Sequence, residues 1–297
     1  MFLRRQVASV LAMSTLFGSG IVLAACTSAN GTSANGTSAN GTSAYVVNQG
    51  SNSVSVIDLA TNTVTAPITV GNGPDAIAIT PNGATAYVAN STDGTVSVID
   101  TNASITTTYN QVTATITVGT NPQAIAITPN GNTAYVVNQG SNSVSVIDLA
   151  TNTVTAPITV GKGPDAIAIT PNGATAYVAN STDGTVTPID TANNTAGTAI
   201  TVGFSPDAIA ITPNGNTAYV VNAGSGTVTP IDTANNTAGT AITGFSWPAA
   251  IAITPNGNTA YVANNTDGTV TPIDTANNTA GTAITVGFSP DAIAITP

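Results

Sequence analysis

Four aspartates recur at the same point of a repeated sequence unit and are the residues of this chain best suited to chemistry. Each follows a proline and begins a run of alternating small and branched residues, and a glutamine and an alanine fill the two remaining copies of the position. Carboxylates gathered around a channel could hold a divalent cation or exchange protons with a substrate. The positions are Asp75, Gln123, Asp165, Asp207, Ala249 and Asp291.

Two interpretations of these aspartates are open. If the runs they begin line the axis of a ring, four carboxylates and one amide encircle a channel mouth, where like charges repel unless a cation or water lies between them. An aspartate after a proline is also an ordinary turn residue at the start of a strand. We favour the second, structural interpretation.

Large aromatic residues gather in the segments just before the same runs. In the chain after residue 25 they comprise every phenylalanine and the one tryptophan, and they fall at consecutive repeat junctions. Bulky apolar groups near a loop surface can form a contact site or can fill gaps between repeats, and we favour the second role. The residues are Phe204, Phe245, Trp247 and Phe288.

The composition restricts the chemistry available. The chain has no histidine, its thirteen acidic residues are all aspartates, and Cys26 is its one cysteine. A Ser-His-Asp triad, a histidine metal site and a glutamate acid–base pair are therefore excluded. No haem, phosphate-loop or EF-hand motif is present, so we expect no cofactor and no dedicated metal site, with Ca²⁺ as the one ion that oxygen ligands could hold.

The charge balance excludes nucleic acid as a partner. The net charge is −10. Loss of residues 1–25 would remove Arg4 and Arg5 and leave Lys162 against thirteen aspartates, a net charge of −12. Binding of DNA or RNA depends on several lysine or arginine contacts to phosphates.

A sixfold repeat must position all these residues. Tyr-Val-x-Asn begins at six tyrosines, and four of the five intervals between them are 42 residues and one is 48. Such a period, with four short apolar runs per unit, is typical of a β-propeller blade. Ile, Val, Thr and Tyr dominate the runs, which in one unit are residues 75–80, 85–90, 95–100 and 112–118.

The ends of the chain predict how the ring closes. The first unit begins at its second strand with Tyr45, whereas residues 291–297 form only a first strand. We therefore predict an all-β, six-bladed propeller of four-stranded antiparallel blades over residues 40–297, closed by pairing of the C-terminal strand with the N-terminal three strands.

Three recurring phrases carry a resemblance to a known family. Tyr-Val-x-Asn, Val-x-x-Ile-Asp and Ala-Ile-Ala-Ile-Thr-Pro-Asn-Gly look like the YVTN-type β-propeller repeats of archaeal surface-layer proteins and bacterial secreted proteins. The resemblance covers nearly everything from residue 40 onward and implies a surface or binding protein, with relatives among lactonases. Seven blades are common in such relatives, whereas six units are counted here.

The N-terminus predicts export and anchoring. Arg4 and Arg5 precede an apolar stretch that ends in Leu23-Ala24-Ala25-Cys26, which resembles a bacterial lipoprotein signal over residues 1–25. Cleavage would leave a lipidated Cys26, followed by a flexible Ser-Ala-Asn-Gly-Thr tether over residues 26–39. We expect an extracytoplasmic lipoprotein on the outer membrane or cell surface.

Two functions follow as hypotheses. The first is a lipid-anchored, non-catalytic binding or scaffold protein that contacts an envelope protein or glycan through its loop face. The second is a divalent-cation-dependent, lactonase-like hydrolase that uses the channel-mouth aspartates. The limited chemistry of the side chains favours the first.

Overall fold

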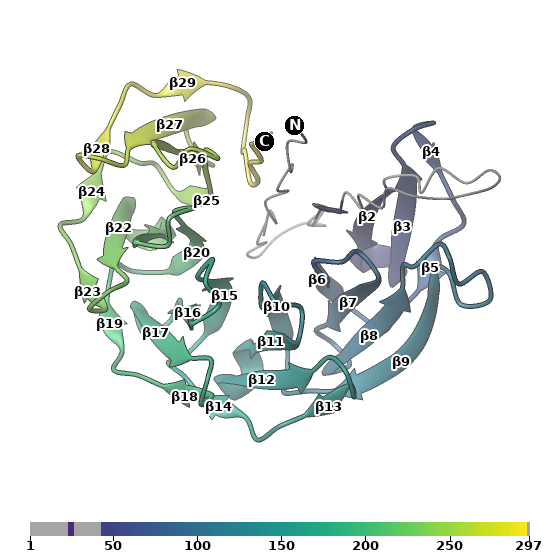
Figure 1. The fold of residues 1–297 in the computed structure, drawn as a ribbon. Coiled ribbons are helices and arrows are strands. Elements are labelled where there is room, and N and C mark those ends of the chain that lie inside the picture. The colour runs from purple at the N-terminus through teal and green to yellow at the C-terminus, as the bar shows by residue number, and fades with distance from the viewer. Residues whose placement is uncertain (1–22, 27–42, 296–297) are drawn as a thin grey trace, which may run out of the picture.

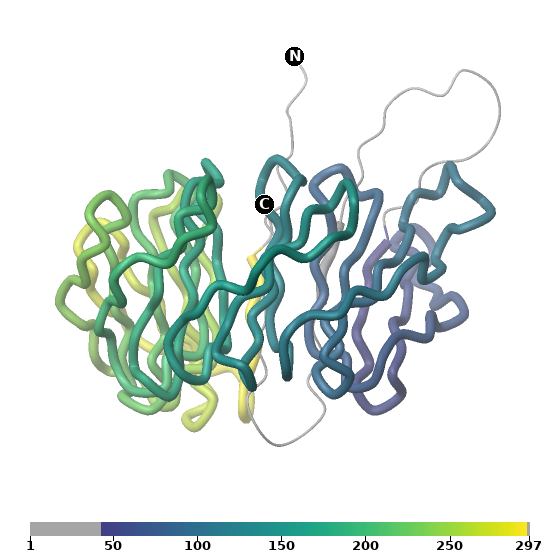
Figure 2. Tube along the Cα trace, turned by 90° about the horizontal axis from the view of Figure 1, so that it is seen from below, coloured from purple at the N-terminus to yellow at the C-terminus, as the bar shows by residue number. Residues whose placement is uncertain are grey.

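The computed structural model describes residues 23–26 and 43–295. In these residues, six antiparallel sheets follow one another in sequence order and stand around a common axis as an open ring (Figure 1). We call these sheets blades 1 to 6. Seen from the side, the turns lie along two opposite faces (Figure 2). We call the face that carries the connections from one blade to the next the loop face.

Each blade runs from the axis outward, strand by strand. The innermost strands of blades 2 to 6 are β6 (Pro74–Ile79), β10 (Pro122–Ile127), β15 (Pro164–Ile169), β20 (Pro206–Ile211) and β25 (Pro248–Ile253). The second strands of blades 1 to 6 are β2 (Ser43–Asn48), β7 (Thr85–Asn90), β11 (Thr133–Asn138), β16 (Thr175–Asn180), β21 (Thr217–Asn222) and β26 (Thr259–Asn264).

The outer half of each blade is more varied. The third strands are β3 (Ser53–Asp58), β8 (Thr95–Asp100), β12 (Ser143–Asp148), β17 (Thr185–Asp190), β22 (Thr227–Asp232) and β27 (Thr269–Asp274). Short 3₁₀ turns follow three of the second strands: η1 (Gln49–Ser51), η2 (Gln139–Ser141) and η3 (Ala223–Ser225).

The outermost strand is continuous in blade 2 alone among the described blades, as β9 (Gln111–Thr117). Elsewhere it consists of two short pieces: β4 (Thr63–Val64) with β5 (Ile68–Thr69), β13 (Thr153–Val154) with β14 (Ile158–Thr159), β18 (Thr195–Ala196) with β19 (Ile200–Thr201), β23 (Thr237–Ala238) with β24 (Ile242–Thr243), and β28 (Thr279–Ala280) with β29 (Ile284–Thr285). In blade 1 the break contains Pro67, which has no N–H to donate to a neighbouring strand.

The recurring Pro-Asn-Gly segment forms the turn between the first and second strands of a blade. In blade 2, Gly83 adopts a φ of 71° and donates its N–H to the Thr80 carbonyl at 2.7 Å. The Thr80 hydroxyl donates to Asn82 Oδ1 at 2.7 Å. The turn is therefore held by its own backbone and side chains.

The tyrosine of Tyr-Val-x-Asn joins neighbouring blades. Its hydroxyl donates to the side-chain oxygen of an asparagine in the outer turn of the next blade, over distances of 2.6 to 3.1 Å. The five pairs are Tyr45 with Asn110, Tyr87 with Asn152, Tyr135 with Asn194, Tyr177 with Asn236, and Tyr219 with Asn278. The repeated motif therefore stabilises the arrangement of blades as well as each blade.

The asparagine of the same motif lies against a glycine at the junction of blades 4 and 5. Asn222 is fully buried, and its side-chain amide donates to the hydroxyls of Thr227 and Thr229. Its side-chain oxygen accepts the N–H of Gly203 at 3.1 Å. A Cβ on Gly203 would lie 2.7 Å from the Cβ of Asn222, so only glycine fits where the preceding blade ends.

The predicted closure by the C-terminal strand is wrong. The inner edge of β2 is paired with β1 (Leu23–Cys26), with Leu23 opposite Val46, and residues 290–295 form no strand. Blades 1 and 6 are separated by a gap (Figure 1). The edge of a sheet accepts any extended segment that can supply backbone hydrogen bonds.

The remaining N-terminal predictions lie largely outside the described residues. Of the expected signal, only Leu23–Ala25 is described, and of the expected tether only Cys26. In the described part of the chain, no helix is long and apolar enough to cross a membrane.

Candidate functional site

The aspartates singled out by the sequence occupy a β-bulge. In the pairing of β15 with β16, Pro164 lies opposite Asn180 and Ala166 opposite Ala179, which leaves Asp165 without a partner in the ladder. The same shift surrounds Asp75, Gln123 and Asp207 in their blades. A bulge frees one side chain from the regular alternation of a strand, and here it does so at the loop-face end of the innermost strands.

Amides of the preceding blade hold three of these carboxylates. Gln139 donates its side-chain N–H to Asp165, and the donor and acceptor belong to neighbouring blades. The corresponding pairs are Gln49 with Asp75 and Asn265 with Asp291. Neutral amide donors offset part of the cost of bringing carboxylates away from water.

Asp207 is the exception. Its residue is 6% exposed, and no hydrogen bond reaches its carboxylate from the described residues. The serine that would take the donor's place, Ser181, gives its hydroxyl hydrogen to the Gly163 carbonyl at 2.9 Å. Burial, assisted by the nearby charge of Asp165, raises the pKa of Asp207 to about 7.

Asp165 itself is 3% exposed. Burial raises its pKa as well, while the Ser181 hydroxyl dipole and the hydrogen bond from Gln139 act in the opposite direction. Asp165 and Asp207 are therefore two buried carboxyl groups from neighbouring blades, and burial raises the pKa of both.

Asp75 lies in a more polar setting. Gln49 and Gln123 both donate to its carboxylate, the second at 3.3 Å from Gln123 Nε2 to Asp75 Oδ2. Burial raises the pKa of Asp75, and hydrogen bonds from Ser91 and these glutamines oppose the rise. Asp291, at the open end of the ring, is exposed.

The carboxylates expected around the channel mouth interact with different neighbours and do not converge on one point. Asp75 is hydrogen-bonded to Gln123 and Asp291 to Asn265, while the charge of Asp165 acts on Asp207. Among residues 23–26 and 43–295, no three acidic or cysteine side chains converge as a metal ion would require.

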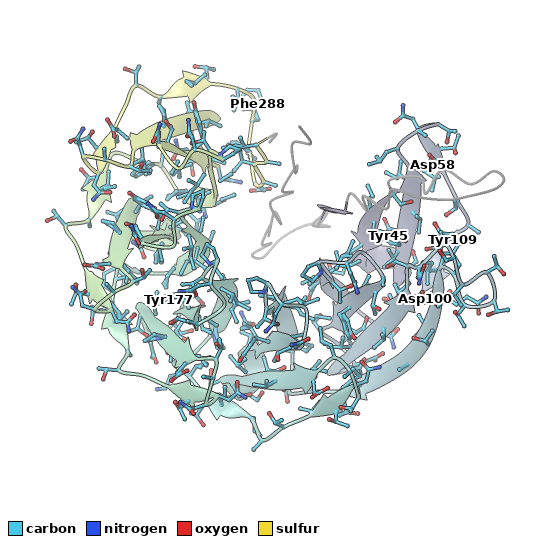
Figure 3. All side chains as sticks on the ribbon, viewed as in Figure 1. Tyr45, Asp58, Asp100, Tyr109, Tyr177 and Phe288 are labelled. Atoms are coloured by element: carbon cyan, nitrogen blue, oxygen red, sulfur yellow. The ribbon has the colours of Figure 1, made fainter. Side chains whose placement is uncertain are left out.

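The aromatic residues divide into two groups. Phe245 is 8% exposed and packs into the core between blades 5 and 6, so it fills a gap as the sequence interpretation favoured. Phe204, Trp247 and Phe288 are exposed to 78%, 54% and 103%. Figure 3 shows Phe288 at the open end of the ring.

Trp247 has an unusual backbone. Its φ is 47°, a left-handed conformation that costs a bulky residue free energy, and the equivalent positions in two other blades are Gly73 and Gly163. A large exposed aromatic side chain in a strained backbone is unfavourable for folding. Such a residue is more easily explained by binding than by stability.

The aspartates that end the third strands hold the turns that follow. In every blade the carboxylate accepts a backbone N–H two residues later, for example from Ala60 to Asp58 at 2.8 Å and from Ala192 to Asp190 at 2.9 Å. They cap the turn on the face opposite the loop face.

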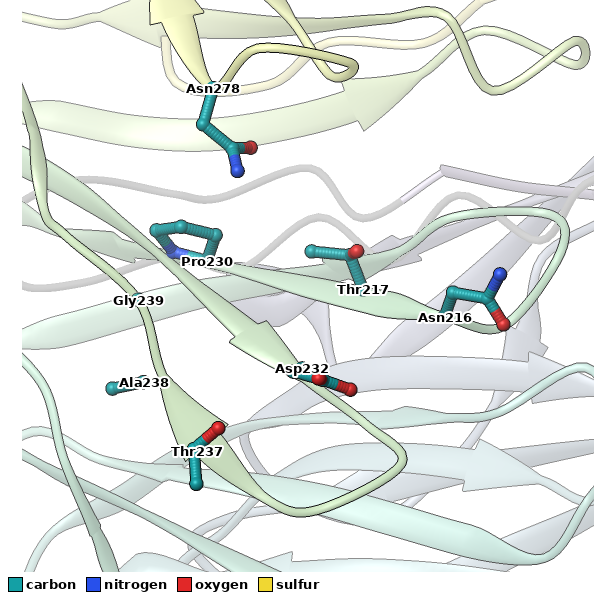
Figure 4. A pocket seen from close by; sticks show the side chains of 8 residues that line it. All are labelled: Asn216, Thr217, Pro230, Asp232, Thr237, Ala238, Gly239 and Asn278. Atoms are coloured by element: carbon teal, nitrogen blue, oxygen red, sulfur yellow. The ribbon is translucent and has the colours of Figure 1, made fainter.

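A pocket of about 350 Å³ lies between blades 5 and 6 on the face opposite the loop face (Figure 4). It is lined by Asn216, Thr217, Pro230, Asp232, Thr237, Ala238, Gly239 and Asn278. An equivalent pocket of about 510 Å³ follows at the open end, lined by Asn258, Thr259, Pro272, Asp274, Ala276, Thr279, Ala280 and Gly281. Both are by-products of the repeat, since the same turn residues form them.

Sequence reasoning missed the amide donors. Gln49, Gln139 and Asn265 each lie 26 residues before the aspartate that they contact. An amide side chain therefore precedes an aspartate by 26 residues three times. In one further blade both positions of this pair are alanine, Ala223 and Ala249. That paired variation is a sequence signal that could have identified the contact.

Comparisons with known proteins support a β-propeller fold. A family model described as Lactonase, 7-bladed beta-propeller, matches residues 34–198. The hydrazine synthase of Kuenenia stuttgartiensis is similar in structure, with a TM-score of 0.70, 25% identity, and coverage of 84% of this chain and 85% of that one. A functionally unknown protein from Desulfotomaculum acetoxidans shows a TM-score of 0.70 and 23% identity, over 83% and 80% of the two chains. No curated protein matches the sequence.

Proposed function

The chain belongs to the family described as Lactonase, 7-bladed beta-propeller, and we propose that it uses the propeller scaffold as a non-catalytic binding protein of the cell envelope. One observation carries the proposal: three aromatic side chains, Phe204, Trp247 and Phe288, project from loop-face connections with more than half of their surface exposed. Exposed aromatic groups grouped on one face are characteristic of contact sites.

The partner that fits this face is an envelope protein or a glycan. The rest of the chain offers amides and hydroxyls together with a net charge of −10, so the surface favours neutral polar partners over anionic ones. Aromatic rings supply contact area at low conformational-entropy cost, and nearby amides supply directional hydrogen bonds.

The experiment compares the parent with a variant in which Phe204, Trp247 and Phe288 are all replaced by serine. An isolated envelope fraction from the source organism is used in three forms: untreated, protease-treated and periodate-oxidised. We expect the parent to bind the untreated fraction and the variant to bind at least tenfold less. Loss of parental binding after protease indicates a protein partner, and loss after periodate indicates a glycan.

A matched control separates surface apolarity from the site. Ile105 is 46% exposed on the face opposite the loop face, and Val64 is 64% exposed on an outer strand. Replacement of both by serine should leave binding unchanged. Equal binding by the aromatic variant and the parent would refute the proposal.

We further propose that the protein is a lipoprotein with YVTN-type repeats, anchored through Cys26 at the outer membrane or cell surface. The supporting features are the arginines, apolar stretch and small residues that precede Cys26. Cleavage before Cys26 would remove Leu23–Ala25, which pair with β2 in the uncleaved chain. Incorporation of a labelled fatty acid should be lost in Cys26→Ser; incorporation that persists would contradict the anchor.

A second candidate function is a lactonase-like hydrolysis that depends on a divalent cation. It is favoured by the family and by the buried pair Asp165 and Asp207, because a pKa of about 7 suits a group that takes a proton from water. Water would attack the lactone carbonyl, the ring C–O bond would break, and a hydroxy acid would form. Oxygen ligands of this kind suit Ca²⁺ or Mg²⁺.

The hydrolase proposal is tested by adding Ca²⁺ or Mg²⁺ to the full chain with a panel of simple lactones. Hydrolysis that depends on the cation and is lost in Asp207→Asn, but kept in Asp183→Asn, would support it. No hydrolysis, together with no effect of either cation on the melting temperature, would eliminate it.

A further inference from the structure

Asp207 is a buried acidic residue whose carboxyl group receives no hydrogen bond from the described chain. It lies at the loop-face end of β20 and is 6% exposed, and no donor within residues 23–26 and 43–295 reaches it. Asp165, the buried aspartate at the same position of blade 4, accepts an N–H from Gln139 of the preceding blade. Buried polar groups nearly always have a hydrogen-bond partner, so a donor for Asp207 is expected from outside the described chain.

The repeat has two donor positions for each of these aspartates, and neither supplies a donor to Asp207. The first position lies in the preceding blade and holds Gln139 for Asp165 but Ser181 for Asp207. The hydroxyl of Ser181 already donates to a backbone carbonyl of its own blade at 2.9 Å. The second position follows the second strand of the same blade, where Asp165 has Ser181 and Asp207 has Ala223. The difference between the two aspartates therefore follows from their neighbours.

The described chain also offers no positive charge to these two carboxyl groups. Lys162 is its one basic residue and forms an ion pair with neither aspartate. Burial of Asp207, together with the nearby charge of Asp165, raises the pKa of Asp207 to about 7. A neutral hydrogen-bond donor would leave the repulsion between the two carboxylates in place, whereas a cation would offset it.

The side chains favour an ammonium ion over a divalent metal ion. Ca²⁺ and Mg²⁺ need several oxygen ligands at once, and no three acidic or cysteine side chains converge among the described residues. An ammonium group carries one positive charge and three N–H donors, so one carboxylate with a second negative charge nearby can hold it. Because Asp207 is almost fully covered, only a small cation can reach its carboxyl group.

From these observations we infer that Asp207 binds the ammonium group of a small primary amine at the loop-face end of β20. An N–H of the ammonium group donates to the Asp207 carboxylate, as the Gln139 amide donates to Asp165 in the neighbouring blade. The negative charge of Asp165 adds a favourable electrostatic contribution. This inference depends neither on envelope binding nor on hydrolysis, since it concerns the purified chain and one small ligand.

The experiment titrates the purified full chain with methylammonium at pH 8, where the Asp207 carboxyl group is mostly ionised, and follows binding by calorimetry. We expect saturable binding. Tetramethylammonium has the same charge but no N–H donor, and it should bind more weakly by about tenfold or more. Equal binding of the two cations would show attraction by net charge alone and would overturn the inference, as would the absence of methylammonium binding.

Two substitutions of equal charge locate the site. Asp207→Asn keeps the size of the side chain and removes its charge, so it should abolish saturable binding of methylammonium. Asp183→Asn removes the same charge from an exposed residue on the loop face and should leave binding unchanged. Binding that persists in the Asp207 variant, or an equal loss in both variants, would refute the assignment to Asp207.

A third variant supplies the missing donor from within the chain. Asn265 occupies in blade 6 the place of Ser181, before the same Thr-Asp-Gly turn, and its amide donates to Asp291. Ser181→Asn should therefore give Asp207 an internal donor and weaken methylammonium binding by about tenfold or more, although the carboxylate is kept.

Ser91→Asn is the matched control for that variant. Ser91 is the equivalent serine of blade 2, and its hydroxyl donates to the Gly73 carbonyl at 2.8 Å, as that of Ser181 donates to Gly163. The control loses the same local hydrogen bond at a distance from Asp207 and should bind methylammonium as the parent does. Undiminished binding by Ser181→Asn would contradict the proposal that the ligand takes the place of a missing donor.

Discussion

The hydroxyl of Tyr177 donates a hydrogen bond of 2.6 Å to Asn236 Oδ1, although the two residues lie in different blades and 59 residues apart in sequence. The ring of Tyr177 is 0% exposed, and Asn236 holds the left-handed conformation, φ 57°, at the outer turn of the next blade. Burial, together with the charge of Asp232, raises the pKa of the tyrosine to about 12, so it stays a donor throughout the physiological range.

This contact predicts an unequal effect of one substitution at two sites. Tyr177→Phe should lower the free energy of unfolding by about 0.5 to 1.5 kcal/mol, because the hydrogen bond from the buried tyrosine to the next blade is lost. Tyr261→Phe should change it by less than about 0.5 kcal/mol in dilute solution, since that hydroxyl has no acceptor in the described chain. Urea unfolding of both variants tests the difference, and equal losses would contradict a role in joining blades.

The buried pair of carboxyl groups predicts a pH dependence. The pKa of Asp207 is about 7 in the folded protein against an ordinary value of 3.8. Between these values the folded state binds more protons than the unfolded state, so stability falls as pH rises and is constant above the folded pKa. Asp207→Asn should therefore melt higher than the parent at pH 8, by about 3 to 8 °C, with a smaller advantage at pH 5.

Asp190→Asn is the control of opposite sign. The N–H of Ala192 and the side chain of Asn193 lower the pKa of Asp190, so its charged form stabilises the fold at neutral pH. That contribution is lost as pH falls through the folded pKa. The variant should melt below the parent at pH 7 and approach it in acid, and a parallel pH response of the two variants would count against both assignments.

The close approach of glycine to a buried asparagine predicts a strict size limit. A Cβ on Gly203 would lie 2.7 Å from that of Asn222, whereas one on Gly287, the equivalent in blade 6, meets nothing within 4 Å. Gly203→Ala should lower the free energy of unfolding by about 1 to 3 kcal/mol. Gly287→Ala should be close to neutral, and a chemical denaturation curve for each variant provides the comparison.

The backbone of Trp247 predicts that stability and binding change in opposite directions. Trp247→Gly should raise the free energy of unfolding by up to about 1 kcal/mol, because glycine adopts a φ of 47° without strain, and should weaken binding to the envelope fraction. Trp247→Ala should weaken binding without that gain. Loss of stability in the glycine variant would show that the tryptophan side chain serves the fold.

Much of the local structure follows from the sequence. The second and third strands are present where the pattern predicts them, and the turn at Pro-Asn-Gly and the cap formed by Asp58 recur with the repeat. These features depend on contacts within a few residues of each other, so a repeat that preserves the residues preserves the structure.

The site was predicted less completely. The positions of Asp165 and Asp207 in the innermost strands follow from the order of the runs, but the amide of Gln139 and the absence of such a donor for Asp207 depend on which blades are neighbours. The sequence placed Phe204 and Phe245 in equivalent loops. One proves exposed and the other buried, because the connection into blade 6 has lost a valine and Gly244 follows the strand directly.

The amino-acid sequence by itself determined the repeat, the β-blade and the limits of the chemistry, because period, alternation and residue types are local properties. Only the tertiary structure decided how the blades end. The edge of β2 accepts backbone hydrogen bonds from any extended segment, so β1 and the C-terminal strand are equivalent at the level of pattern. The choice between them depends on which segment the arc of blades brings next to β2. The packing angles between successive blades add up along the arc and so fix where its ends lie.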